Sequence, residues 1–291
     1  KSTGALMTAE EKRISEAKIK EILATEHYFA EDDLALILSL ADFLHKPLLL
    51  EGPAGVGKTD LARCLAHGLG MELIRLQCYE GLDERHALYE WNYQKQLLFL
   101  ESRPQGSWDS LEAELFSAPF LLARPILKAF LSERRTVLLI DEIDKSDEEF
   151  ESFLLEALSD FAVTIPEWGT VQAKTKPLVI LTSNGARDFS DALKRRCVHY
   201  DLNYPDEARE ALILRAKIPG IGERLSLAIA EFVADLRRKS LRKKPSIAET
   251  IDWARVLVSL GIENLKDERI PATYSFLLKY REDLEWLKNI K

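Results

Sequence analysis

The chain has 291 residues, of which 46% are hydrophobic and 30% charged, and its formal net charge is −8. This composition is typical of a globular protein and provides for one large or two smaller domains. No apolar run approaches the roughly 18 residues that span a bilayer, and the N-terminal residues are polar rather than signal-like. We therefore expect a cytoplasmic protein with no membrane span, and the acidic balance argues against nucleic acid as its partner.

The first half of the chain alternates predicted helices and strands. Apolar residues at helical spacing predict helices at about 9–23, 33–44 and 59–68. Short apolar runs predict strands at 48–50 and 72–78. A long, aromatic-rich stretch at 80–124 fits no simple strand–helix repeat, so it is interpreted as an insertion.

The second half begins with the same alternation and then changes. Fully apolar runs predict strands at 137–140 and 178–182, and helical patterns fall at about 147–161 and 188–196. Residues 161–174 contain Pro166, Gly169 and alternating β-formers, which predict a hairpin. Beyond Pro205 only helices are predicted, at about 206–216, 223–238, 246–261 and 274–287. The order indicates an α/β domain over residues 1–204, with a parallel sheet covered on both faces, and a smaller all-helical lid domain over 205–291.

The three cysteines are scattered, and no histidine lies near them at metal-ligand spacing. They are Cys64, Cys78 and Cys197. This arrangement suggests neither a disulfide framework nor a zinc site, so we expect buried, inert thiols.

A glycine-rich loop follows the first predicted strand. Its pattern, a glycine, four residues and then Gly57-Lys58-Thr59, is that of a P-loop, which binds nucleoside triphosphates. Glycines permit positive φ, so backbone N–H groups can face phosphate oxygens; Lys58 can reach the β- and γ-phosphates, and Thr59 offers a hydroxyl to Mg²⁺. The alternative is a glycine turn before a helix. The predicted nucleotide-binding residues are Gly52, Pro53, Ala54, Gly55, Val56, Gly57, Lys58, Thr59 and Asp60.

Two adjacent carboxylates, Asp141 and Glu142, follow the apolar run at 137–140. In a P-loop protein we expect Asp141 to hold Mg²⁺ together with Thr59, and Glu142 to orient the water that attacks the γ-phosphate. Alone, the same acidic run would be compatible with an ordinary helix cap. Together with the P-loop, the pattern predicts Mg²⁺-dependent hydrolysis of a nucleoside triphosphate, which the family resemblance described next implies to be ATP.

These motifs resemble those of AAA+ ATPases, and further segments match in order. Asn184, after the strand at 178–182, resembles the polar residue called sensor 1, although a simple Asn-Gly turn is the alternative. The segment 191–197 resembles the one that carries the arginine finger, which implies that Arg196, or less favoured Arg195, acts in a neighbouring subunit; two solvated arginines at a helix end are the alternative. The resemblance thus implies a homo-oligomer, expected to be a hexameric ring.

The segment 78–101 further resembles the MoxR branch of AAA+ ATPases, whose members are paired with von Willebrand factor A domain proteins. The predicted hairpin at 166–171 would be that branch's insertion before sensor 1. This likeness implies a chaperone-like ATPase that remodels a protein partner, in roles such as metal insertion or enzyme-complex maturation.

Several features depart from the family pattern or stay open. The expected sensor 2 arginine is replaced by Ala248 or Glu249, and Arg255 is more plausibly structural. The basic run 237–244 is either a contact surface for nucleic acid or an acidic partner, or a solvated helix end. Aromatic residues in the 80–124 stretch either grip a substrate or pack on the core: Tyr89, Trp91, Tyr93 and Phe99. Tyr28 and Phe29 are candidates for the adenine site.

Two rival functions remain at this point. The first is a nucleic-acid motor or restriction-type NTPase on the same scaffold, using ATP or GTP, with the basic run as its contact surface. The second is a nucleotide-gated scaffold with little turnover. The sequence identifies neither the base nor the partner, because a P-loop binds phosphates rather than the ring.

Overall fold

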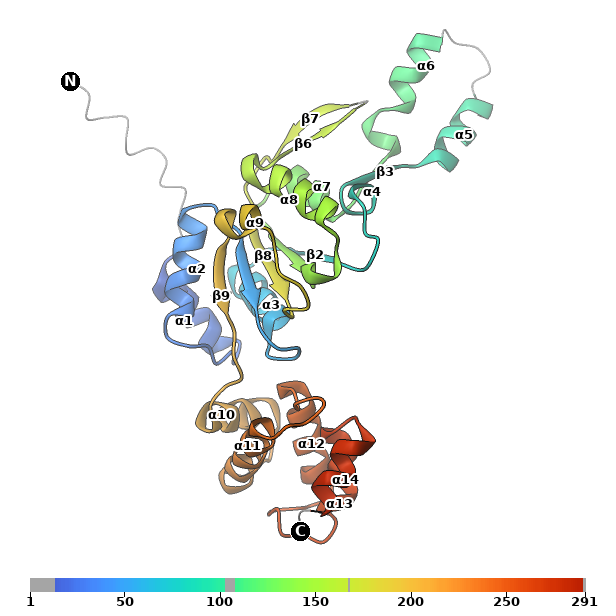
Figure 1. Ribbon diagram of the computed structural model, residues 1–291. Helices are drawn as coiled ribbons and strands as arrows, with labels where there is room; N and C mark the ends of the chain where they lie inside the picture. The colour runs from blue at the N-terminus through green and yellow to red at the C-terminus, as the bar shows by residue number, and fades with distance from the viewer. Residues whose placement is uncertain (1–13, 103–107, 167, 290–291) are drawn as a thin grey trace, which may run out of the picture.

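The computed structural model describes residues 14–102, 108–166 and 168–289, and it is built around one parallel sheet (Figure 1). Five strands form the sheet in the order β2-β5-β8-β1-β9, and each pairs in parallel with its neighbours. They are β1 (Leu48–Glu51), β2 (Leu73–Gln77), β5 (Val137–Asp141), β8 (Leu178–Ser183) and β9 (Val198–Asp201). Parallel strands place their carboxyl ends at one edge, where ligands of such sheets bind.

Helices cover both faces of the sheet. In β5, Val137 and Leu139 contribute to the hydrophobic core on one face, and Leu138 and Ile140 to the core on the other. The first face is packed by α1 (Glu16–Thr25), α2 (Leu34–Phe43) and α3 (Lys58–Leu69). The second is packed by α4 (Glu84–Ala87), α7 (Pro125–Leu131), α8 (Glu148–Asp160) and α9 (Asp191–Arg196). Because the strands are apolar on both sides, the two layers of helices follow directly, and the predicted α/β fold is confirmed.

The stretch at 80–124 forms an arm beside the sheet. Its elements are α4, β3 (Tyr89–Trp91), α5 (Tyr93–Ser102), α6 (Trp108–Leu115), the 3₁₀ turn η1 (Ala118–Phe120) and β4 (Leu121–Ala123). Strands β3 and β4 pair antiparallel, and α5 and α6 extend away from the body of the protein (Figure 1). The expected hairpin is also present, as the antiparallel pair β6 (Ala162–Ile165) and β7 (Gly169–Gln172).

The C-terminal helices gather on the P-loop side of the sheet, around a core of their own (Figure 1). They are α10 (Glu207–Lys217), α11 (Glu223–Arg238), α12 (Ile247–Ser259), α13 (Ile270–Leu277) and α14 (Arg281–Asn289). Trp253 and Tyr274 are buried at the centre of this core and pack with Phe232. No helix in the described part of the chain is long and apolar enough to cross a membrane.

Three expectations about the elements need correction. The helix expected at 9–23 begins at Glu16, after Ser15 accepts from the Lys18 amide as an N-cap, and residues 9–13 lie outside the described ranges. The strand β9 was not predicted, because its four residues mix apolar and polar side chains at the sheet edge. The single helix expected at 274–287 is two helices, since Leu278 is extended and directs its buried side chain into the helical core.

Candidate active site

A pocket of about 370 Å³ opens at the carboxyl end of the sheet, between the P-loop and the C-terminal helices. Most of the predicted site residues line it: Ala54, Gly55, Val56, Gly57, Lys58, Thr59, Asp60, Asp141, Glu142 and Asn184. Gly52 and Pro53 lie behind it in the loop, where their carbonyl oxygens accept from the Lys58 ammonium. The exposed Arg195 and Arg196 do not line the pocket of their own chain.

Close packing makes two P-loop glycines necessary. Gly52 has φ +156°, and a Cβ there would lie 2.0 Å from the Leu202 carbonyl oxygen. Gly55 has φ +77°, and its Cβ would lie 2.5 Å from the Cβ of Ser246 at the start of α12. Gly57 is left-handed and precedes the first residue of α3 without a side-chain cap. The amides that begin α3 are therefore available to an anion, as in phosphate sites at helix N-termini.

The side chain of Lys58, the first residue of α3, turns back into the P-loop and is almost fully buried. Its ammonium donates to the Gly52 and Pro53 carbonyl oxygens at 2.6 and 2.9 Å, and to Asn184 Oδ1 at 2.9 Å. Burial lowers the pKa of Lys58, while nearby carboxylates, first Asp144, act to raise it. The predicted P-loop lysine and the predicted sensor 1 residue are thus in direct contact.

Asp141 is the most heavily hydrogen-bonded carboxylate of the pocket. Thr59 and Thr182 donate to its Oδ1 from 3.0 and 2.5 Å. The Arg75 guanidinium donates to Oδ2 from Nε at 3.0 Å and from Nη2 at 2.5 Å. Asp141 is 2% exposed, so its carboxylate contacts these donors and almost no solvent.

Glu142 is held beside it in a strained backbone conformation, with φ 58° and ψ 49°. Its amide donates to Thr182 Oγ1 at 2.9 Å, which links β5 to β8. Its carboxylate accepts from Gln77 Nε2 at 2.8 Å and pairs with Lys145 at 2.6 Å. Positive φ in a non-glycine residue costs energy, and such residues cluster at active sites.

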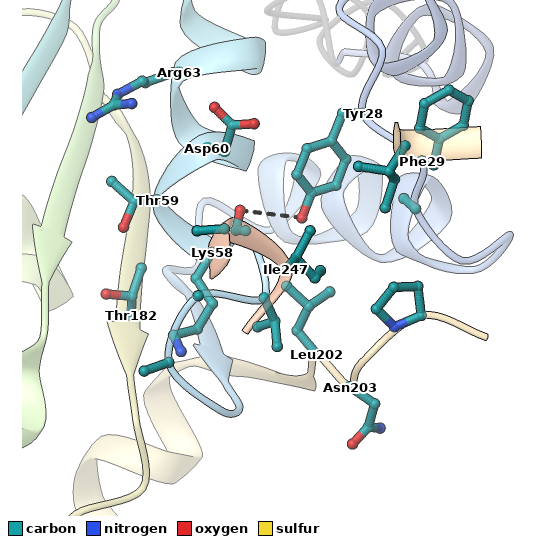
Figure 2. Close-up of a pocket in the computed structure, with 18 of the residues that line it drawn as sticks. Tyr28, Phe29, Lys58, Thr59, Asp60, Arg63, Thr182, Leu202, Asn203 and Ile247 are labelled. Carbon is teal, nitrogen blue, oxygen red and sulfur yellow. Dashed lines mark hydrogen bonds between the residues drawn. The ribbon is translucent and has the colours of Figure 1, made fainter. Parts of the chain in front are cut away.

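The other end of the pocket is apolar and suits a flat ring. Its walls include Tyr28, Leu202, Ile213, Ile247 and Ile251. Tyr28 points toward the P-loop in Figure 2, and its hydroxyl donates to the Gly57 carbonyl oxygen at 3.3 Å. Burial raises the pKa of Tyr28 well above its usual range, so the hydroxyl keeps its proton.

Two cations of α10 stand at the pocket rim, each beside an acidic residue. Arg209 lies 3.6 Å from Glu31, and Lys217 lies 3.7 Å from Asp60. Ala248, at a position where the family's sensor 2 arginine was expected, lines the pocket without a charge. The sequence analysis named neither Arg209 nor Lys217. The helical pattern at 206–216 predicts a helix but does not show which of its residues face a ligand on another domain.

Arg75 and Gln77 were also missed, and here the sequence held a signal. In the strand LIRLQ the apolar residues alternate with Arg75 and Gln77, which places both polar side chains on one face of β2. The structure brings them to Asp141 and Glu142 across the β2–β5 pair.

The basic run 237–244 is mostly engaged within the protein. Arg237 is buried and forms a bidentate pair with Glu210, at 2.5 and 2.8 Å. Its guanidinium also lies 4.3 Å from the centre of the Tyr204 ring. Further ion pairs engage Arg238, Lys239, Arg242 and Lys243. Arg237 is therefore part of the helical core and not of a solvated helix end, whereas the other four basic residues lie at the surface paired with acidic side chains.

The aromatic residues of the arm divide between the two interpretations. Trp91 is buried and packs edge-on against Phe116, with ring centres 5.2 Å apart, and Phe99 packs against Phe120 at 5.3 Å. Tyr93 is 63% exposed. Packing therefore accounts for Trp91 and Phe99.

No group of three or more potential metal ligands among His, Cys, Asp and Glu occurs in the described residues. All three cysteines are free and buried. Burial raises the pKa of Cys64 to about 11 and those of Cys78 and Cys197 to about 12. Such thiols stay protonated at neutral pH, as expected for packing residues.

Comparison with known proteins agrees with this site. The family model described as "ATPase family associated with various cellular activities (AAA)" matches residues 48–204, which is more than half of the chain. The chain therefore belongs to the AAA family, and it is an ATPase. The matched range includes the P-loop, the acidic pair and Asn184.

This chain aligns with very different shares of the lengths of similar proteins. An uncharacterized protein of Staphylococcus epidermidis is 26% identical over 75% of this chain and 78% of its own. The chaperone protein ClpB of Bacillus anthracis is 27% identical over 56% of this chain but only 16% of its own. The peroxisomal ATPase PEX6 of Dictyostelium discoideum is 27% identical over 58% and 12%. The chain thus spans less than a fifth of ClpB and PEX6.

Among solved structures, a RuvB variant of Thermotoga maritima aligns with a TM-score of 0.48 and 18% identity. The alignment covers 90% of this chain and 70% of that chain.

Proposed function

We propose that this ATPase binds ATP in the pocket with the phosphates on the P-loop and the adenine in the apolar end. Backbone amides at 55–59 and the Lys58 ammonium would hold the phosphates, with Tyr28, Ile213 and Ile247 around the base. The observation that carries the proposal is the convergence of Lys58, Asn184, Asp141 and Glu142 on one pocket, through the contacts described above.

The donor set fits Mg²⁺. Thr59 Oγ1 and Asp141 Oδ1 lie 3.0 Å apart at the start of α3, and both are the hard oxygen ligands that this ion prefers. When bound, Mg²⁺ would neutralise charge that develops on the phosphates. Thr182 donates to the same Asp141 oxygen and helps to orient the carboxylate.

Hydrolysis needs a water in line with the γ-phosphate. Glu142 is proposed to accept the proton of that water, because it is the partly exposed carboxylate next to Asp141. Gln77 and Lys145 fix its position. Asn184, which already contacts the P-loop lysine, would report the presence of the γ-phosphate through its amide.

We further propose that Arg196, or Arg195 beside it, completes the site of a neighbouring subunit in a ring, for which a hexamer is the expected size. Both arginines are exposed at the end of α9 and lie outside their own pocket. Within this proposal, residues 1–204 are the nucleotide-binding domain and 205–291 the lid, and the protein works in the cytoplasm.

The work done with the ATP is proposed to be remodelling of a protein partner. The likeness to ClpB, which is named a chaperone protein, supports this class of function. The MoxR likeness of segment 78–101 adds a von Willebrand factor A domain protein as the candidate partner, with metal insertion or enzyme-complex maturation as candidate roles. The pairing of the basic run with acidic side chains disfavours a nucleic-acid motor.

Specific ATPase rate measured against protein concentration tests the proposal. We expect the rate per subunit to rise with concentration, and to be lost in Lys58→Ala and Glu142→Gln. Arg196→Ala should abolish hydrolysis while leaving ATP affinity within about twofold of the wild type, because an arginine supplied in trans acts on the transition state. A rate independent of concentration, together with an active Arg196→Ala variant, would exclude the shared site.

A further inference from the structure

Arg75 is hydrogen-bonded to Asp141, the carboxylate that is proposed to hold the metal. Its guanidinium makes two hydrogen bonds to Asp141 Oδ2, and the same carboxylate accepts from two threonine hydroxyls at Oδ1. Asp141 is buried, so these four donors surround it almost completely. Both Arg75 bonds therefore fall on Oδ2, whose other donor is the Thr59 hydroxyl at 3.2 Å.

A guanidinium and a divalent cation on this one carboxylate repel each other, and each weakens the hold of the carboxylate on the other. Both carry positive charge, and both would need oxygens of one buried side chain. Two charge-assisted hydrogen bonds from one arginine to one carboxylate are among the stronger polar contacts in proteins. Mg²⁺ entering at Thr59 and Asp141 must therefore weaken the Arg75 contact.

Arg75 is free to move aside. Its side chain is 43% exposed, in contrast to the 3% exposure of its partner. Gln77, two residues further along β2, already accepts from Arg75 Nη2 through its Oε1. A second acceptor at the open edge of the sheet lets the guanidinium leave Asp141 without being left unpaired.

We propose that Arg75 is a positioning residue that competes with Mg²⁺ for Asp141 and so lowers the affinity of the site for the metal. The inference rests on the metal site proposed above. A purely structural role makes a different prediction, since an arginine that only neutralises a buried carboxylate would leave the metal affinity unchanged or raise it by orienting Asp141.

The test measures binding rather than turnover. A fluorescent ATP analogue at fixed concentration is titrated with MgCl₂ in a chelator-buffered solution, using the full chain, and the Mg²⁺ concentration at half-maximal signal is compared between variants. In Arg75→Gln this concentration should fall about tenfold, the effect expected for loss of one charged hydrogen-bonded competitor. Arg75→Lys, which keeps the charge but not the fork, should give an intermediate value.

Arg124→Gln is the matched control. Arg124 is exposed to a similar degree, 41%, and pairs with Glu90 in the arm, outside the pocket. Its removal should leave the Mg²⁺ titration unchanged. Far-UV circular dichroism of each variant checks that the fold is retained, and Arg75→Lys supplies the comparison if the glutamine variant does not fold.

An unchanged or increased half-maximal Mg²⁺ concentration in both Arg75 variants would overturn the competition. Failure of the metal site itself has another signature, because Asp141→Asn would then show the same Mg²⁺ dependence as the wild type. A wild-type titration that Asp141→Asn abolishes and Arg75→Gln leaves in place refutes the role of Arg75 alone.

Discussion

The buried pair between Arg237 and Glu210 offers a sharp test of how the helical region is held together. Glu210 is fully buried, and Arg237 is 7% exposed. Besides its two bonds to Glu210, Arg237 donates from Nε to the Pro245 carbonyl oxygen at 2.8 Å. One side chain therefore joins α10, α11 and the segment that leads into α12.

Arg237→Ala removes this cation and leaves the buried Glu210 carboxylate without the guanidinium that pairs with it. Breaking a buried pair from one side costs about 3–5 kcal/mol, because an uncompensated charge remains. The neighbouring Arg238 provides the control, since it pairs with Glu207 on the same helix but is 69% exposed. An exposed pair of that kind contributes about 0–1 kcal/mol.

The assay is equilibrium unfolding in urea, followed by far-UV circular dichroism. Arg237→Ala should lose several times more unfolding free energy than Arg238→Ala. Replacing both partners, as Arg237→Met with Glu210→Leu, should recover much of the loss, because no charge is then left buried. Equal losses in the two single variants, or a loss below about 1 kcal/mol in Arg237→Ala, would refute this account of the pair.

Four further outcomes follow from packing and ionisation. Gly52→Ala should cost at least about 1–3 kcal/mol in urea unfolding, because its Cβ meets a backbone carbonyl, and more than Gly70→Ala, where nothing lies within 4 Å. Ser246→Ala should cost about 0.5–2 kcal/mol in the same assay, because it removes the capping box of α12; no change would contradict that. In the folded chain at pH 8 the three thiols should react slowly with a disulfide reagent, and fully after unfolding; fast labelling would contradict their burial. Since burial raises their pKa values to about 11 and 12, only the unfolded chain ionises them above about pH 8.5, so the stability that they contribute should be complete below that pH and fall as the pH rises toward 12.

The central sheet was largely predictable, because β1, β5 and β8 are built on apolar runs and β2 is mostly apolar. Four of the five strands, and the helices that follow β1, β5 and β8, were located within a few residues. The helices after β2 fall in the stretch at 80–124, in which no elements were predicted. The fifth strand, β9, was not, because its residues Val198 to Asp201 alternate in polarity and its position at the edge is set by pairing with β1. The break between α13 and α14 likewise depends on a tertiary contact, the burial of Leu278 in the core of the C-terminal helices.

The site was predictable where a motif fixes the order of residues, and less so where tertiary contacts bring residues together. Lys58 and Asp141 follow from local patterns. The partnership of Arg75 with Asp141 depends on the pairing of β2 with β5, which the sequence does not state. Charge counting also misled at Arg237, whose place in a basic run gave no sign that its side chain is buried against Glu210.

The close approach of Gly55 to Ser246 sets a mechanical limit on the protein. Only a hydrogen atom fits on Gly55 at this point, because a methyl group would stand 2.5 Å from the Ser246 Cβ. At this contact the helical region has no room to move closer to the phosphate loop. Gly55 therefore sets the smallest distance between the P-loop and the start of α12. A larger residue at position 55 would keep these two segments further apart.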